Sequence, residues 1–363
     1  MARPAVEPEV DVAILHPEAT AGSGPLTRAV AAARLEVAEE HLLGFRVAGA
    51  TRARVVAGPP DSWPFGARLR EIAGELGDGG LIVLGSGAIP LATASDRREL
   101  VAAARASEPR ALTNNRYSGD VIAVSRARST LRDVPDLPTD NALPRWLAEE
   151  AGVPVEDLRR RWRLGIDVDG PLDLLLLGGR DPSGLSAVDV APVATALAAL
   201  RSVVDDASAE LMVAGRVSAA NLAWLEARTA SRTRALVEER GLRTRRDGQR
   251  PAASVLGALL DRDGPAALGG LLAALGEAAI VDTRVLLAHR FGADQGGWPP
   301  AEDRFASDLL LPQRVRDPWL HELTASALAA PIPVLLGGHT LVGPGLRLAI
   351  GRRPRAVARA SLP

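Results

Sequence analysis

Short apolar runs alternate with helix-like segments through the first half of the chain, and this alternation limits the possible fold more than any other feature. Residues 10–15 and 81–84 have the composition of buried strands, and residues 26–45 carry apolar side chains at helical spacing. Strands that alternate with helices predict α/β units built on a largely parallel sheet. We therefore expect an α/β protein with a mainly parallel, Rossmann-like sheet flanked by helices.

The other expected elements follow from the same two patterns. Ser95 is the candidate N-cap of a helix expected at residues 96–105. Pro171 favours a helix over a strand at residues 172–177. Further strands are expected at residues 53–57, 121–124, 163–168, 210–214, 279–287 and 332–336, and residues 346–350 as one more. Further helices are expected at residues 65–76, 96–105, 143–151, 172–177, 190–204, around 219–240 and at 253–276.

The chain has 363 residues, which favours two domains over one. The Gly-rich residues 178–184 are the best candidate for a linker, because they follow an apolar segment and precede a second strand–helix alternation. We expect a first domain at residues 1–180 and a second, smaller α/β domain of unknown role at residues 181–363. The arginine-rich turn at residues 243–250 and the tail at residues 352–363 lie outside the expected packed elements.

Charge and cysteine content exclude several classes of protein. The 43 basic and 44 acidic residues nearly balance, so we expect neither nucleic acid nor a membrane surface as a partner. No apolar run approaches the roughly 20 residues of a membrane span, and residues 1–10 lack the apolar core of a signal peptide, so we expect a cytoplasmic protein. The chain contains no cysteine, which excludes thiolate metal sites and a thiol nucleophile.

The sequence also contains no lysine, so every one of its basic side chains is an arginine. Arginine cannot be deprotonated in proteins and does not form a Schiff base, whereas lysine does both. A P-loop nucleoside triphosphatase, a protein kinase site and a pyridoxal-phosphate enzyme all depend on a lysine, and all three are therefore excluded.

The stretch from Asp167 to Asp173 is the most informative motif. Asp167 and Asp169 are two residues apart after an apolar run, so their carboxylates point the same way if the backbone is extended. Such a pair can hold Mg²⁺ through oxygen ligands while the phosphates of a nucleotide complete the coordination. The alternative is a strand-to-helix turn in which an aspartate caps the helix that opens at Pro171.

Two further segments offer groups that could contact a ligand. Gly85, Ser86 and Gly87 follow the strongest strand, where a backbone without Cβ atoms can approach a phosphate closely; the alternative is a simple tight turn. Residues 114–120 concentrate polar side chains that could read a base, a sugar or a phosphate; the alternative is a loop that satisfies its own backbone. The arginine-rich residues 159–163 suggest a solvated face or a phosphate clamp.

The order of these pieces resembles the nucleotidyltransferases related to molybdenum-cofactor cytidylyltransferases and phospholactate guanylyltransferases, which share a glycosyltransferase-A-like fold. The resemblance covers about residues 10–200 and depends mainly on residues 167–174, Asp-Val-Asp-Gly-Pro-Leu-Asp-Leu, where the family reads D-[IV]-D-T-P-x-D-L. It implies a protein that binds a nucleoside triphosphate and Mg²⁺ and transfers the nucleotidyl group to a phosphorylated or carboxylated small molecule.

The resemblance also implies roles for individual residues. Asp167 and Asp169 would hold Mg²⁺, and the segment from Gly85 to Leu91 would lie where the family binds nucleotide and metal. The loop at residues 114–120 would face the acceptor. The residues expected to contact the nucleotide are Gly85, Ser86, Gly87, Asn114 and Asn115, and the candidate catalytic residues are Arg116 and Asp120.

Two departures from the family pattern support a different class of function. Gly24 stands about where the family has a lysine before Pro-Leu, and residues 85–88 lack the aspartate of the metal-binding turn. Both losses reduce the charge stabilisation that phosphoryl transfer uses, although Arg28 or Arg116 could replace the cation. The alternative is a catalytically degenerate protein that binds a ligand or acts as a scaffold. A third hypothesis places chemistry in the second half, where Asp282, His289 and His339 would have to converge.

Overall fold

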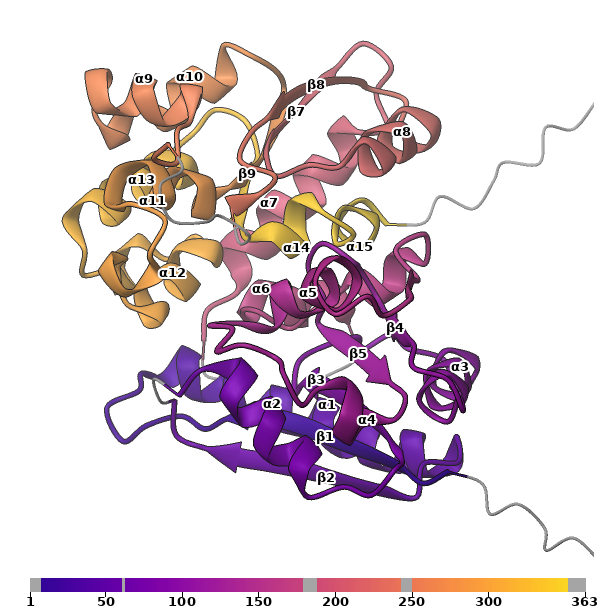
Figure 1. The fold of residues 1–363 in the computed structure, drawn as a ribbon. Helices are drawn as coiled ribbons and strands as arrows, with labels where there is room; N and C mark the ends of the chain where they lie inside the picture. The colour runs from indigo at the N-terminus through magenta and orange to yellow at the C-terminus, as the bar shows by residue number, and fades with distance from the viewer. Residues whose placement is uncertain (1–7, 61–62, 179–187, 243–249, 352–363) are drawn as a thin grey trace, which may run out of the picture. The chain divides into compact units, whose positions relative to one another are not determined.

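The computed structural model describes residues 8–60, 63–178, 188–242 and 250–351, which form two compact units (Figure 1). The described part of the first unit comprises residues 8–60, 63–169 and 241–242, and the second comprises residues 170–178, 188–240 and 250–351. The longest continuous part of the first unit therefore ends at Asp169, before the expected boundary at residue 180. Most of the expected linker and arginine-rich turn, and the whole tail, lie outside the described residues.

The first unit contains a six-stranded mixed sheet in the order β2-β1-β3-β5-β4-β6. Strands β1, β2 and β3 are mutually parallel, β5 is antiparallel to both β3 and β4, and β4 is parallel to β6. Its elements are β1 (Val10–Pro17), α1 (Pro25–Val47), β2 (Arg52–Gly58), α2 (Phe65–Gly74), β3 (Gly80–Gly85), α3 (Ala94–Ala104), β4 (Ala111–Thr113), β5 (Val121–Val124), α4 (Ala127–Thr130), α5 (Leu143–Glu149) and β6 (Val155–Asp157).

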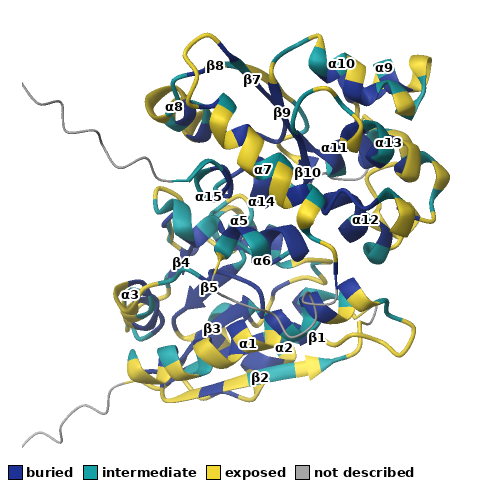
Figure 2. Ribbon diagram, turned by 180° about the vertical axis from the view of Figure 1, so that it is seen from behind, coloured by how far each residue is buried: buried dark blue, intermediate teal, exposed yellow. Residues whose placement is uncertain are grey.

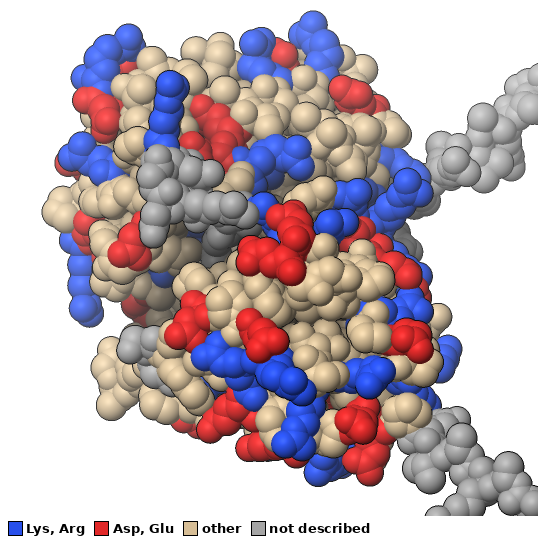
Figure 3. Space-filling model, viewed as in Figure 1, with Lys and Arg blue, Asp and Glu red and all other residues tan. Residues whose placement is uncertain are grey.

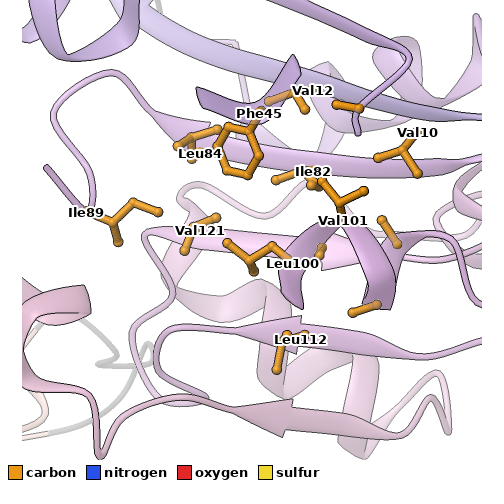
Figure 4. Close-up of a cluster of buried hydrophobic side chains, with 14 of the residues drawn as sticks. Val10, Val12, Phe45, Ile82, Leu84, Ile89, Leu100, Val101, Leu112 and Val121 are labelled. Carbon is orange, nitrogen blue, oxygen red and sulfur yellow. The ribbon is translucent and has the colours of Figure 1, made fainter. Parts of the chain in front are cut away.

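Both faces of this sheet are covered, which is why β3 is buried along nearly all of its length. Alternate residues of β1 and β3 point to opposite faces. Val12, Ile14 and Ile82 pack with side chains of α1 and α3, among them Phe45 and Leu100 (Figure 4). The other face packs against α2, α4 and α5.

The second unit is built on a smaller, fully parallel sheet in the order β10-β9-β7-β8. Along its helices, buried and exposed residues alternate in Figure 2, as expected for amphipathic helices packed on a sheet. Its elements are α6 (Pro171–Leu177), α7 (Ala191–Val203), β7 (Glu210–Gly215), α8 (Ala219–Arg228), β8 (Arg232–Val237), α9 (Val255–Asp263), α10 (Leu268–Ala273), β9 (Ala278–Asp282), α11 (Thr283–Phe291), α12 (Ala301–Asp308), α13 (Pro318–Leu328), β10 (Val334–Gly337), α14 (His339–Val342) and α15 (Leu346–Ile350).

The α/β class and most expected elements are confirmed, and five segments differ. The helix expected at 253–276 is divided at Gly264 into α9 and α10, with a 3₁₀ turn between them. Residues 163–168 form a 3₁₀ turn and an isolated bridge instead of a strand. The helix expected around 219–240 ends at Arg228, and β8 follows it. The strand expected at 279–287 ends at Asp282, whose side chain caps α11. Residues 346–350 are a helix. None of the described helices is long and apolar enough to cross a membrane.

The N-cap of α3 is Thr93 and not the expected Ser95, and the cap includes a buried carboxylate. Asp96 is 1% exposed and accepts hydrogen bonds from the backbone and the hydroxyl of Thr93 at 2.8 and 2.7 Å. Arg161 and Arg163 donate to the same carboxylate at 2.9 Å each. Burial alone would raise the pKa of Asp96, but the bonds from Thr93, Arg163 and Arg161 lower it to about 2.

We expect Asp96→Asn to lower the free energy of unfolding by about 2 kcal/mol at pH 7. Because the folded pKa of Asp96 lies below its unfolded value, its stabilising contribution is present above about pH 4 and is lost as the pH falls towards 2. Urea unfolding at pH 7, 4 and 2.5 should show the variant and the parent converging. Glu156→Gln, which removes an exposed ion pair with Arg110, is the control. A deficit that stays constant with pH would contradict the prediction.

Candidate functional site

The candidate site lies at the carboxyl edge of the first unit's sheet, between β1 and β3. The chain passes from β1 to β2 on one side and later places β3 on the other side of β1. Open α/β sheets bind ligands outside the carboxyl ends of their strands at such a switch point. The turn formed by Gly85, Ser86 and Gly87 continues β3 at this position.

The two aspartates of the Asp-x-Asp motif lie against this turn. Asp167 forms an antiparallel bridge with Ala88, and the N–H of Val168 donates to the carbonyl of Gly87 at 3.0 Å. Gly87 is required by this contact, since a Cβ there would lie 2.8 Å from Oδ1 of Asp167. A Cβ on Gly85 would meet no atom within 4 Å. The motif and the glycine turn therefore share one edge of the sheet.

The turn does not present a row of free backbone donors. The N–H groups of Gly85 and Ser86 donate to the carbonyls of Asp120 and Leu15, and the N–H of Ala88 closes the turn onto Gly85. Among the residues described, the N–H of Gly87 has no such partner. A phosphate cradle made from several of these N–H groups is therefore not formed.

Arg34 on α1 reaches the motif and was not identified from the sequence. Its Nε donates to the carbonyl of Val168 at 2.6 Å, and its Nη2 lies 3.4 Å from Oδ1 of Asp169. The side chain of Asp169 is still 41% exposed, so this contact leaves the carboxylate accessible. Within the described residues, Arg34 is thus the cationic side chain that contacts the Asp-x-Asp motif directly.

Four carboxyl groups influence one another at this edge. Burial, and then the charge of Asp169, raise the pKa of Asp167 to about 7, while Arg34 opposes the change. Burial, and then the charges of Asp167 and Asp140, raise the pKa of Asp120 well above its usual value. Like charges gathered in this way favour the entry of a proton or another cation.

The polar loop at residues 114–120 is stabilised by hydrogen bonds among its own residues. This is the alternative to a ligand-binding loop that the sequence left open. The amide nitrogen of Asn114 donates to Oδ2 of Asp120 at 2.7 Å and to the carbonyl of Leu164 at 2.9 Å. Its oxygen accepts from the N–H groups of Asp120 and Val121. All four hydrogen-bonding positions of this amide are used, so Asn114 positions Asp120 and has no capacity left for a nucleotide.

The other two residues expected in this loop differ from Asn114. The side-chain oxygen of Asn115 accepts from the N–H of Tyr117 at 3.0 Å, which is a local turn contact. Arg116 is half-buried, and within the described residues its side chain has no ion-pair or hydrogen-bond partner. Arg116 therefore remains the candidate of this loop that is most able to pair with an anion.

A buried His–Ser pair completes the edge. Nδ1 of His16, at the end of β1, lies 3.0 Å from Oγ of Ser86. Burial, followed by the charge of Arg34, lowers the pKa of His16, so the imidazole is neutral at pH 7. Ser86 is 2% exposed and therefore serves to join β1 to the turn. No local spacing pattern marks this pair, because the two residues are 70 positions apart in the chain.

A pocket of about 200 Å³ opens beside these groups. Apolar side chains of β1, β3 and β5 line it together with Phe65 of α2 and Pro144 of α5. Gly85, Asp120 and Asp140 also line it. The pocket therefore joins an apolar surface to two of the four interacting carboxyl groups.

The other segments considered for ligand contacts have structural roles. Arg161 and Arg163 are bound to Asp96, which is not the arrangement of a phosphate clamp. In the second unit the charge of His339 affects Asp282. His289, however, lies about two turns along α11, where its Nε2 is 3.1 Å from Oδ2 of Asp261. The three residues of the third hypothesis therefore do not form one cluster.

Comparisons with known proteins identify no relative, so the geometry of the site alone supports a proposal about its function. No protein-family model matches the chain, and no curated protein is significantly similar to it. Within the described part of the chain, no group of three or more His, Cys, Asp or Glu side chains is placed to hold a metal ion.

Proposed function

We propose that the first unit binds a nucleoside triphosphate together with Mg²⁺ and transfers its nucleotidyl group to a phosphorylated or carboxylated small molecule. The observation that carries the proposal is the position of Asp167 and Asp169 against the Gly85–Gly87 turn, at the switch point of the sheet. The pocket beside them, with a volume of about 200 Å³, is large enough for a ring system.

The donor chemistry of the two aspartates fits Mg²⁺, which prefers carboxylate oxygens. Asp169 is accessible, and a bound cation would offset the burial and the charge of Asp169 that together raise the pKa of Asp167. Two protein carboxylates do not complete an octahedral shell, so water and phosphate oxygens would supply the other ligands. When bound, the ion would neutralise phosphate charge that no lysine is present to neutralise.

The proposed step needs no general base. An oxygen of the acceptor's phosphate or carboxylate is already anionic at neutral pH; it would form the new bond to the α-phosphorus as the bond to the pyrophosphate leaving group breaks. The task left to the protein is to orient the two anions and offset their repulsion. Arg34 lies at the motif and Arg116 lies in the facing loop with no partner in the described structure, so these two arginines are suited to it.

We expect calorimetric titration with CTP, GTP, ATP or UTP in the presence of Mg²⁺ to give saturable heat with at least one of them. Asp169→Ala should weaken that binding at least tenfold, because it removes the accessible carboxylate of the motif. Asp136→Ala, which removes an exposed carboxylate paired with Arg70, is the matched control and should bind as the parent does. No heat and no melting shift with any of the four nucleotides would end the proposal.

A second function, a ligand-binding protein without catalysis, is favoured by one specific contact. Arg34 lies within 3.4 Å of Asp169, so a cation of the protein already stands beside the carboxylate that Mg²⁺ would use. In that case nucleotides would bind but no turnover would follow. Release of pyrophosphate from any nucleoside triphosphate by the purified protein would exclude this second function.

A further inference from the structure

We propose that two copies of this chain associate through the edge of the second unit's sheet, with β8 of one copy antiparallel to β8 of the other. This inference concerns an interaction surface of the second unit and does not depend on the function proposed for the first. It follows from the exposure of β8, the direction of its backbone groups and the charges at its two ends.

Strand β8 lies at the margin of its sheet, beside β7 (Figure 1). The residues of β10, at the opposite margin, are all buried, whereas those of β8 are exposed or half-buried. Among the residues described, no strand pairs with the outer side of β8. An open strand edge presents backbone donors and acceptors that can pair with another chain.

The ladder between β7 and β8 determines which backbone groups of β8 point outward. The N–H of Arg232 donates to the carbonyl of Ala209 at 3.0 Å. At the other end of the strand, the N–H of Glu238 donates to the carbonyl of Gly215 at 3.0 Å. Alternate residues of a strand direct their backbone groups to opposite sides, so every second residue between these two also faces β7. The residues whose backbone groups point away from the sheet are Thr233, Ala235 and Val237.

These outward residues define one register for two copies. With a two-fold axis at Ala235, this residue faces itself, and Thr233 faces Val237 of the second copy. All the outward residues of β8 then exchange backbone hydrogen bonds, which a shift of the axis along the strand would not allow. A two-fold contact uses the same surface on both copies, so the assembly closes as a dimer.

The same register brings opposite charges together. Arg232 faces Glu238 of the second copy at one of the closely spaced positions of an antiparallel ladder, where such a pair is favourable. Arg232 is exposed, and within the described residues its side chain has no partner. Glu238 accepts from the hydroxyl of Ser254 and the N–H of Val255. A carboxylate accepts more than two hydrogen bonds, so Glu238 can also receive the arginine.

The other charge on β8 does not oppose this pairing. Natural edge strands are often protected by charged side chains that discourage a second copy. Arg234 is instead held within its own unit by Glu210 of β7 and by the carbonyl of Leu275, at 3.0 Å each. In the proposed register Arg234 faces Leu236 of the second copy, so no two like charges lie opposite each other.

Exposed apolar side chains lie at the same end of the strand. In the described part of the second unit three large apolar side chains are exposed, and two of them belong to this region. Val237 is 44% exposed, and Val255 is 61% exposed next to Glu238. Pairing would cover Val237 with Thr233 of the second copy and remove apolar surface from water.

Sedimentation velocity of the full chain over a series of protein concentrations tests the dimer. We expect the parent to form a dimer whose fraction rises with concentration. Ala235→Pro removes an N–H that points outward and that the ladder with β7 does not use, so the fold should be kept while the dimer weakens at least tenfold. A parent that stays monomeric at every concentration would overturn the proposal.

A charge reversal gives a second test with a matched control. Arg232→Glu would face Glu238 of the second copy and should weaken the dimer at least tenfold. Arg314→Glu makes the same change at an exposed arginine of the same unit, in the 3₁₀ turn Pro312–Arg314, and should dimerise as the parent does. Melting followed by circular dichroism confirms that each variant is folded. If both β8 variants dimerise like the parent, the contact lies elsewhere and the proposal is wrong.

Hydrogen exchange at single-residue resolution tests the register. The amides of Thr233, Ala235 and Val237 should exchange more slowly as the protein concentration rises, while those of Arg232 and Arg234 stay protected throughout. Slow exchange at the three outward amides of a monomer would show that another part of the same chain covers this edge, and the proposal would fall. A dimer in which these three amides remain unprotected would exclude pairing through β8.

Discussion

Replacing Asp282 with alanine is expected to lower the free energy of unfolding of the second unit by about 3–5 kcal/mol. Asp282 ends β9 and pairs with Arg216, which follows β7, through contacts of 2.6 and 3.0 Å. The two side chains are 0% and 3% exposed. The replacement would leave the guanidinium of Arg216 charged and unpaired inside the protein, which is the costly way to break a buried ion pair.

The pKa of Asp282 is set by the charged groups that surround it. Burial alone would raise its pKa, but the neighbouring Arg216, and then His339 and Arg284, hold the pKa below its usual value. Asp282 also caps α11 by accepting from the N–H of Arg284. Gly215 has a φ of +123°, and a Cβ there would lie 2.3 Å from the Cβ of Asp282, so the end of β7 lies too close to the Asp282 side chain for any residue that has a Cβ atom.

Thermal unfolding followed by circular dichroism measures the effect, which should lower the melting temperature by on the order of 10 °C. Asp263→Ala removes an exposed ion pair with Arg262 in the same unit and should leave unfolding unchanged. The double variant Arg216→Met, Asp282→Leu should lose less stability than Asp282→Ala, because no buried charge remains. A single variant within about 1 kcal/mol of the parent would show that the pair is dispensable.

Gly87→Ala is expected to destabilise the first unit by about 1–3 kcal/mol and to weaken the proposed binding of magnesium and nucleotide. The added methyl group would lie 2.8 Å from Oδ1 of Asp167 and 2.9 Å from the carbonyl of Val168. Since the second of these atoms belongs to the backbone, the motif itself must move away from the turn.

Gly77→Ala is a closely matched control, because it makes the same substitution in the same unit, outside the pocket and with no atom within 4 Å of the added group. Urea unfolding of both variants gives the change in stability, and calorimetric titration with the nucleotide that the parent binds gives the change in affinity. If the two alanine variants behave alike in both measurements, the contact between the turn and the Asp-x-Asp motif has no energetic role.

Elements with strong local signals could be predicted from the sequence. The buried strand at residues 81–84 and the helix that opens at Pro171 are both present. The strand expected at residues 279–287 was wrong beyond Asp282, because a short apolar run fits either a strand or a buried helix. Strands β4 and β6 have three residues each, which is too short to produce a periodic pattern.

The candidate site was only partly predictable, because its local motifs are joined by contacts between distant positions. The glycine turn and the two aspartates each carry a local signal, and the structure brings them together. Arg34 lies 135 positions from Asp169, and nothing in its own surroundings marks it. Asn114 was predicted to contact a ligand. Its amide is instead fully hydrogen-bonded within the protein, and only the three-dimensional structure shows these bonds.

The mixed charges of the surface in Figure 3 agree with the near-neutral balance of the sequence. Blue and red side chains alternate over the face shown, so no single-sign region marks a binding surface there.

The loop beside the site contains the single tyrosine of the chain, Tyr117, which is 54% exposed and has the guanidinium of Arg159 5.5 Å from its ring centre. Biosynthetic replacement with fluorotyrosine would therefore give one fluorine resonance per molecule, located next to the proposed ligand. Its frequency would report rearrangement of this loop directly, with no need for a reactive handle or an attached dye.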